Sequence, residues 1–327
     1  MEPHPPLSPP RVFVTRALPV DVALELGPSI EARVFAHDRV PSADELAEGA
    51  REARTLVSLV SDRVDDALLA RLPRLRHVAQ MAVGYDNVDV AACRARGVLV
   101  THTPGTLTES TADLALALLL AVARRFPEGE AMVRAGAFPG WSPTMLLGVE
   151  LAERTLGVVG YGRIGRAVAR RARAFGMRVI ATSRTAHAPD GIAEHVPLAR
   201  LLSESDAITL HCPGSAATRH LIGERELASM KRGAILINTA RGTVVDEDAL
   251  VRALERGALG GAGLDVYEHE PRVHPGLIQR RDVVLLPHLG SATIEARTRM
   301  AKMALGDAAR VLRGEPALHV VPELRTP

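Results

Sequence analysis

The chain has 327 residues, roughly twice the ~150 residues typical of one domain, so the sequence predicts two domains or one domain with a large insertion. Hydrophobic residues make up 47% and charged residues 24% of the chain, a globular balance that excludes a disordered, collagenous or disulfide-scaffold protein. A net charge of +2 and an aromatic share of 3% argue against a nucleic-acid-binding protein, which needs a basic surface or stacking aromatic rings.

In the first third of the chain, short apolar segments alternate with helix-like stretches. The strand-like segments are RVFVT, ARVFA, TLVSLV, LRHVAQ and GVLVT, the last of which ends at Thr101. This alternation predicts a parallel sheet. From Thr106 the pattern becomes that of one long buried helix, with Thr106 and Glu109 as a capping box and Pro127 as its stop.

A second alternation follows an irregular stretch, residues 135–153, that holds the only tryptophan, Trp141. Such a long irregular stretch usually serves function or contacts a partner. Strands are then predicted at TLGVVG, MRVIAT, DAITLH, AILINT, GAGLDV and DVVLLP, and helices at GRAVARRARAFG and DEDALVRALERG. These segments predict a second parallel sheet, and residues 291–314 predict a helix long enough to return to the first half.

Cellular location is inferred from three features of the sequence. The longest apolar run, residues 114–123, is far shorter than the ~20 residues that a bilayer span needs. The Pro-rich start, MEPHPPLSPP, is predicted to be a disordered tail rather than a signal peptide. Cys93 and Cys212 stand far apart, which disfavours a disulfide framework and a metal site. We therefore expect a cytoplasmic protein with no metal and no membrane partner.

The strongest local motif is a glycine loop. Gly160, Gly162 and Gly165 form G-x-G-x-x-G directly after an apolar strand and directly before a helix. The first glycine allows the tight turn, the second lets the backbone approach a pyrophosphate, and the third lets the helix pack closely, while helix amides face the phosphates. The motif predicts dinucleotide binding; the alternative is a tight turn that binds no ligand.

The end of the next predicted strand indicates which dinucleotide binds. An NAD-selective site places Asp or Glu there, about 20 residues after the glycines, to bind the ribose hydroxyls. From Arg166 to Pro189 there is no acidic residue, and Ser183 and Arg184 occupy the turn. A hydroxyl and a guanidinium suit a 2'-phosphate, so we expect NADPH, with NADH possible. The alternative is that Arg184 is an ordinary surface arginine.

Taken together, the chain resembles the D-isomer-specific 2-hydroxyacid dehydrogenases, and within them the glyoxylate/hydroxypyruvate reductases. Besides the glycine loop, the resemblance rests on MAVGYDNVDV from Met81, HTPGTLTESTADLALALLL from His102, ILINTARG from Ile235, GLDVYEHEP from Gly263 and VVLLPHLGSAT from Val283. It implies an α/β fold of two parallel-sheet domains with a cleft between them. Residues 1–104 and 289–327 would form a flavodoxin-like substrate domain, and residues 105–288 a Rossmann nucleotide-binding domain.

The resemblance places the family's catalytic arginine on Arg241, its acid on Glu270 and its histidine on His288. A guanidinium fork can grip the carboxylate of a 2-oxo acid and polarise its ketone. Hydride addition leaves negative charge on the ketone oxygen, and histidine can supply the proton. Glu270 would orient the imidazole of His288 and stabilise its charged form.

The resemblance implies further contacts. The amides of Val83 and Gly84 would bind the substrate carboxylate, Trp141 with Met145 and Leu146 would limit the pocket, and Asp265 would lie near the nicotinamide carboxamide; for Val83, Gly84 and Asp265 the alternative is an ordinary strand-end turn. Arg241 and His288 would also contact the cofactor. Other expected cofactor contacts are Thr111, Tyr161, Arg163, Ile164, Thr185, His211, Cys212, Pro213, Thr218, Thr239, Ala240 and Gly290.

The predicted function is reduction of glyoxylate or hydroxypyruvate with NADPH. Two alternatives stay open: reduction of another 2-oxo acid such as 2-ketogluconate, and a nucleotide-sensing corepressor, which uses the same fold and can keep the three residues. The family places the stretch around Trp141 on an arm that embraces a second subunit, so a homodimer is expected; burying a lone exposed Trp gives an independent physical reason.

Overall fold

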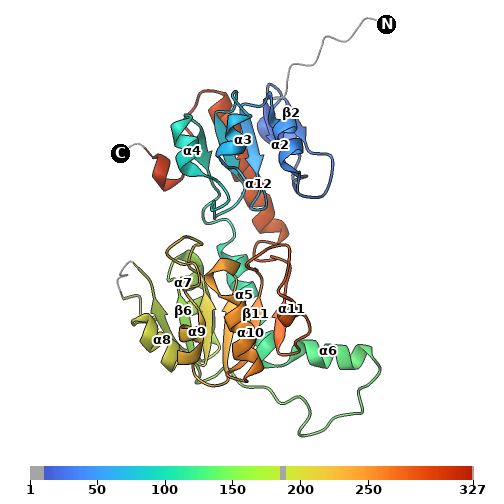
Figure 1. The fold of residues 1–327 in the computed structure, drawn as a ribbon, viewed down its shortest axis with the longest axis vertical. Helices are drawn as coiled ribbons and strands as arrows, with labels where there is room; N and C mark the ends of the chain where they lie inside the picture. Colours follow the sequence, from blue (N-terminus) through green and yellow to red (C-terminus); the bar gives the residue numbers. More distant parts are fainter. Residues whose placement is uncertain (1–10, 185–188, 326–327) are drawn as a thin grey trace, which may run out of the picture. The chain divides into compact units, whose positions relative to one another are not determined.

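The computed structural model describes residues 11–184 and 189–325 (Figure 1). The Pro-rich start and Thr185, one of the expected cofactor contacts, lie outside the described residues. The chain divides into two compact units: unit 1 runs up to Leu107 and resumes at Thr293, and unit 2 runs from Thr108 to Ala292. No helix in the described part is long and apolar enough to cross a bilayer.

Unit 1 contains a five-stranded parallel sheet in the order β2-β1-β3-β4-β5. This is the flavodoxin-like order. The strands are β1 (Val12–Val14), β2 (Ala32–Val34), β3 (Thr55–Ser58), β4 (His77–Gln80) and β5 (Leu99–Thr101). The helices are α1 (Val22–Leu26), α2 (Ala43–Ala50), α3 (Asp66–Ala70), α4 (Val90–Ala95), α12 (Ile294–Leu312) and the 3-10 helix η2 (Pro322–Leu324).

The core of unit 1 has two layers because its central strands are buried on both faces. Helix α12 covers one face, where Met300 and Leu305 pack with Val57. Helices α2, α3 and α4 cover the other, where Leu46 and Leu68 are buried. The predicted final helix is therefore part of unit 1.

Unit 2 contains a seven-stranded parallel sheet in the order β12-β11-β10-β9-β6-β7-β8. If β6, β7 and β8 are counted as strands 1, 2 and 3 and β9, β10 and β11 as strands 4, 5 and 6, the order is the Rossmann order 3-2-1-4-5-6. Strand β12 is one further strand, beside β11. The strands are β6 (Thr155–Val159), β7 (Arg178–Thr182), β8 (Glu194–His195), β9 (Ala207–Leu210), β10 (Ala234–Asn238), β11 (Leu259–Leu264) and β12 (Val283–Leu285). The predicted α/β fold with two parallel sheets is confirmed.

Helices lie on both faces of this sheet. Residues of α5 and α7 are buried in one cluster, and residues of α8, α9 and α10 in the other. The helices are α5 (Thr108–Ala123), α6 (Phe126–Arg134), α7 (Arg163–Ala174), α8 (Leu198–Glu204), α9 (Glu224–Ser229), α10 (Glu247–Glu255), α11 (Pro275–Ile278) and the 3-10 helix η1 (Gly242–Val244).

The long helix expected from Thr106 differs in its limits. It begins at Thr108 and ends at Ala123, before Pro127 is reached. Pro127 instead lies in the first turn of α6, where its missing N–H would have no partner inside the helix. The proline thus begins a second helix, which the sequence analysis missed.

Candidate active site

The glycine loop joins β6 to α7, as its sequence predicted. Gly160 has φ +94°, and a Cβ there would lie 2.6 Å from the Cys212 nitrogen. A Cβ at Gly165 would lie 2.1 Å from the Gly160 oxygen. Gly162 is the N-cap of α7, and a Cβ there would meet nothing within 4 Å. Two glycines are required by the packing of the protein itself, whereas Gly162 leaves open space beside the helix amides. This arrangement fits the pyrophosphate of a dinucleotide.

The turn after β7 holds Ser183, which is half-buried, and Arg184, which is exposed. Burial raises the pKa of the Cys212 thiol, and the charge of Arg184 opposes this rise. Arg184 therefore lies near the end of β9, and Cys212 is a poor nucleophile. The next acid along the chain, Asp190, accepts a hydrogen bond of 2.7 Å from the Tyr161 hydroxyl. That hydroxyl thus binds a protein carboxylate.

The expected cofactor contact His211 follows β9 and is engaged by two threonines. Its Nε2 lies 2.9 Å from Thr209 Oγ1 and its Nδ1 lies 3.5 Å from Thr239 Oγ1. Burial lowers the pKa of His211 to about 3, so the ring stays neutral at physiological pH. The Thr218 hydroxyl in the same loop donates to Pro213 O at 2.7 Å.

Arg241 follows β10 and is half-buried. Its backbone is fixed by Asn238, whose Nδ2 donates to Arg241 O at 2.9 Å and whose Oδ1 accepts from Ala240 N at 3.0 Å. The Asn side chain therefore shapes the turn that presents the guanidinium at the carboxyl end of the strand.

Glu270 and His288 form a pair. His288 Nδ1 lies 3.0 Å from Glu270 Oε2, while Glu270 Oε1 accepts from Tyr267 N at 3.1 Å. Burial has the largest single effect on Glu270 and opposes its ionisation, but the hydrogen bond and charge of His288, the bond from Tyr267 N–H and the charge of Arg241 together outweigh it, so the pKa of Glu270 is lowered. The charge of Arg241 adds to this lowering, which places the guanidinium in the field of the pair.

The loop that carries His288 is held by Asp265 at the end of β11. The His288 N–H donates to Asp265 O at 2.9 Å, and the Asp265 carboxylate accepts from Leu289 N at 2.6 Å and Gly290 N at 2.8 Å. Burial raises the pKa of Asp265. His288 itself has φ +56°, a left-handed conformation rare for residues with a side chain. Surrounding bonds therefore hold it in place.

Thr111 lies on α5 and is buried. Its hydroxyl donates to Gly290 O at 2.9 Å, so the side chain expected to contact the cofactor binds the His288 loop. The remaining residues of the expected nucleotide site fall on two segments of unit 2. Arg163 and Ile164 begin α7, and Ala240 precedes Arg241.

Val83 and Gly84 follow β4 in unit 1. Val83 O lies 2.9 Å from His102 Nδ1, and Gln80 Nε2 lies 3.5 Å from Gly84 O. The ring of Tyr85 meets that of His102 edge to face. His102 therefore supports the segment after β4, and its position directly after β5 places its side chain at the same sheet edge.

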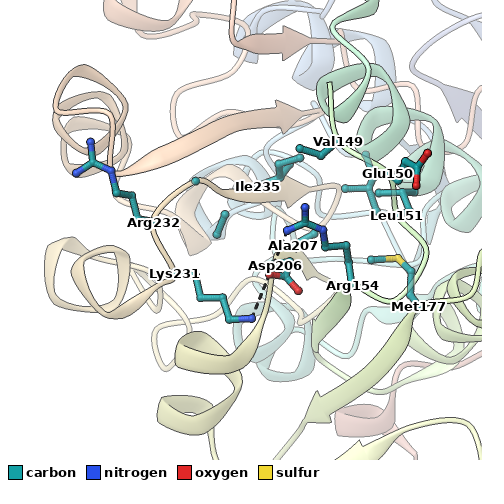
Figure 2. Close-up of a pocket in the computed structure, with 13 residues that line it drawn as sticks. Val149, Glu150, Leu151, Arg154, Met177, Asp206, Ala207, Lys231, Arg232 and Ile235 are labelled. Atoms are coloured by element: carbon teal, nitrogen blue, oxygen red, sulfur yellow. Dashed lines mark hydrogen bonds and ion pairs between the residues drawn. The ribbon is translucent and has the colours of Figure 1, made fainter. Parts of the chain in front are cut away.

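A pocket of unit 2 lies at the opposite edge of its sheet (Figure 2). Arg154, Asp206 and Gly233, which line it, each precede a strand. Lys231 Nζ lies 3.1 Å from Asp206 Oδ1, and Figure 2 shows Arg154 directed toward the same carboxylate. Ligands of open α/β sheets bind at the carboxyl ends of strands, so this pocket is not the candidate active site.

Comparisons with known proteins identify the family of the chain. The family model described as "D-isomer specific 2-hydroxyacid dehydrogenase, NAD binding domain" matches residues 116–290. A glyoxylate reductase of Thermococcus litoralis is 49% identical over 313 residues, covering 94% of this chain and 95% of the relative. A glyoxylate reductase of Aeropyrum pernix is 47% identical over 321 residues, and the alignment covers 95% of this chain and 96% of that relative.

A solved structure gives the same result. The structure is that of the NADPH-dependent glyoxylate/hydroxypyruvate reductase of Sinorhizobium meliloti in complex with NADP and malonate. It is 34% identical to this chain with a TM-score of 0.85, and the match covers 97% of this chain and 98% of the solved chain. With the family match, the similarity to glyoxylate reductases and the two sheet orders, the chain belongs to the D-isomer-specific 2-hydroxyacid dehydrogenase family, in its glyoxylate reductase branch.

Proposed function

We propose that this protein reduces glyoxylate and hydroxypyruvate to their 2-hydroxy acids with NADPH. The observation that carries the proposal is the 3.0 Å pair of His288 and Glu270 beside Arg241, at the carboxyl ends of neighbouring strands. The 49% identity to a glyoxylate reductase supports the substrate. Unit 2 would be the nucleotide-binding domain and unit 1 the substrate domain.

Each of the three residues has a chemical task. The guanidinium of Arg241 binds the substrate carboxylate and polarises the ketone. The nicotinamide, when bound, supplies the hydride. His288 keeps Nδ1–H on Glu270, so that Nε2 donates the proton to the ketone oxygen. Because its pKa is lowered, Glu270 stays ionised and stabilises the protonated imidazole. The amides of Val83 and Gly84 are further donors for the carboxylate.

NADPH is the proposed cofactor because of the turn after β7. Arg184 is exposed there and can pair with a 2'-phosphate. Asp190, the first acid after the turn, already accepts from Tyr161 and from Ile192 N at 2.9 Å. It is thus engaged elsewhere than at a ribose hydroxyl, which favours NADPH over NADH.

A homodimer is proposed from α6 and the segment that follows it. Figure 1 shows both projecting from the body of unit 2. Helix α6 buries none of its residues, and Trp141 is 82% exposed. A second copy of the chain would cover this apolar arm. The exposed apolar side chains are Phe126, Val133, Phe138, Trp141 and Leu147. Sedimentation that shows a monomer at micromolar concentration would refute the dimer.

The function is tested with four acids and both cofactors. Glyoxylate and hydroxypyruvate should have the highest kcat/KM with NADPH, above a branched 2-oxo acid and 3-phosphohydroxypyruvate. In the proposed dimer the arm of one copy would bring Trp141, with Met145 and Leu146, near the active site of the other copy, where they would limit the space for larger groups. Tight dinucleotide binding without turnover would contradict the enzyme, and a preference for the phosphorylated or branched acid would contradict the substrate.

A further inference from the structure

The loop that carries Glu270 contains a second carboxylate, Glu268, whose contacts are with residues other than His288. Its side chain is only 10% exposed. The carboxylate oxygen Oε1 accepts from Arg219 NH2 at 2.8 Å and lies 2.7 Å from His220 Nε2. Glu268 therefore connects this loop to the segment that follows β9.

The backbone of Glu268 makes a further connection. Its N–H donates to Glu247 Oε1 at 2.8 Å. Glu247 begins α10 and is 6% exposed. Burial, which its bond from the Glu268 N–H only partly offsets, raises the pKa of Glu247. A carboxylate buried this deeply needs its hydrogen bond, so the position of Glu268 is fixed relative to the segment that follows Arg241.

The segment after Arg241 contacts both the segment that follows β9 and the loop that carries Glu268 and Glu270. The His220 N–H donates to Thr243 O at 2.8 Å, and the Ile222 N–H donates to Val244 O at 3.0 Å. On the other side, a Cβ at Gly242 would lie 1.8 Å from the Tyr267 carbonyl carbon. Only a glycine allows the two backbones to approach this closely.

We propose that Glu268 is a positioning residue for the reaction: it joins the segments 219–222, 241–247 and 267–270, and so fixes Glu270 in contact with His288. The charged or titratable groups that face Glu268 are Arg219, His220 and Glu247, and Asp246 Oδ2 lies 3.9 Å from His220 Nδ1. Part of this inference rests on the proposed function, because its kinetic effect is measured on the reduction of a 2-oxo acid.

Glu268→Ala removes the carboxylate oxygen that contacts Arg219 and His220, so the loop 267–270 loses its side-chain link to the segment 219–222. Because a small displacement of a catalytic group is costly, kcat should fall about tenfold or more. KM for glyoxylate should change by less than about twofold, because the Arg241 segment keeps its backbone bonds to residues 220–222. The basic limb of the pH profile should move to lower pH, since Glu270 holds protonated His288 less well.

The Glu270→Gln background gives the decisive comparison. If Glu268 acts through Glu270, Glu268→Ala should change kcat by less than about twofold there. Glu268→Gln, which keeps an oxygen acceptor, should restore part of kcat. Glu204→Ala is the matched control, because the Glu204 carboxylate likewise contacts two basic side chains, accepting from Arg200 Nε at 2.6 Å and Arg178 NH1 at 3.1 Å, but lies on α8, away from the loop 267–270.

A spectroscopic measurement is independent of turnover. In spectra of 15N-labelled imidazoles, assigned with a His288→Gln variant, the wild-type His288 Nδ1 signal should be that of a hydrogen-bonded N–H. Glu268→Ala should shift it toward the value of a solvated ring, whereas Glu204→Ala should not. An unshifted signal in folded Glu268→Ala, or equal loss of kcat in both Glu270 backgrounds, would overturn the positioning role. Absence of turnover in the wild type would overturn only the proposed function, since the spectrum still decides.

Discussion

Glu270→Gln isolates the charge of Glu270 from its shape, because glutamine keeps an oxygen that can accept from His288 Nδ1. For opposite charges about 4 Å apart, Coulomb's law gives about 1 kcal/mol in water and about 4 kcal/mol at an effective dielectric constant of about 20. The side chains of His288 and Glu270 are 33% and 38% exposed, so solvent screening favours the lower part of this range, roughly 1.4 kcal/mol. That energy corresponds to about one pH unit.

The sign follows from the ionisation of Glu270, whose pKa is lowered. The carboxylate is charged at neutral and alkaline pH and stabilises protonated His288, the form that reduction requires. Without the charge, the basic limb of kcat/KM for glyoxylate should therefore move down by about one pH unit. The assay follows NADPH consumption from mildly acidic to alkaline pH, with Glu204→Gln as the control. An unchanged midpoint, or a shift to higher pH, would refute the role of Glu270.

Three further substitutions test the rest of the site. Arg241→Ala should lower kcat/KM by two to four decades, roughly 3 to 6 kcal/mol, because a bidentate grip on the carboxylate is lost; steady-state kinetics that match the wild type would contradict this. Arg184→Ala should weaken kcat/KM for NADPH at least about tenfold and leave NADH nearly unchanged, since one charge-assisted bond is removed; equal losses would count against NADPH selection. Gly162→Ala should leave Tm unchanged, because its Cβ meets no atom within 4 Å, yet weaken dinucleotide binding in a calorimetric titration; unchanged binding would place the pyrophosphate elsewhere.

Much of the fold could be predicted from the sequence because each buried parallel strand is a short run of consecutive apolar residues. The segments TLGVVG and AILINT are continuous apolar runs, and the structure buries all of β6 and β10. The edge strand β8 has no such pattern, since Glu194 and His195 are both exposed. Pro127 was misread for a similar reason: a proline marks a helix boundary but does not tell whether a helix ends or begins there.

The supporting residues of the site were harder to predict because their contacts join distant parts of the chain. Glu268 meets Arg219 and Glu247, and no local spacing links the three. No local pattern explains why residue 242 is a glycine, yet a Cβ there would lie 1.8 Å from the Tyr267 carbonyl carbon. Sequence motifs identify residues that chemistry makes distinctive, whereas positioning residues become visible only when the strands are placed in order.

His211 and His288 show how the structure separates two similar candidates. Each follows a strand of unit 2, and in the sequence each lies in a position suited to a ligand. Both ring nitrogens of His211 lie within hydrogen-bonding distance of threonine hydroxyls, those of Thr209 and Thr239, and burial lowers the pKa of His211 to about 3. A proton donor must be protonated near the working pH, so His211 is unsuited to that task. The imidazole of His288 is 33% exposed and its Nδ1 is paired with the Glu270 carboxylate, so that in the proposed mechanism Nε2 would face the substrate. The difference between a structural and a reactive histidine is therefore set by what each ring nitrogen contacts.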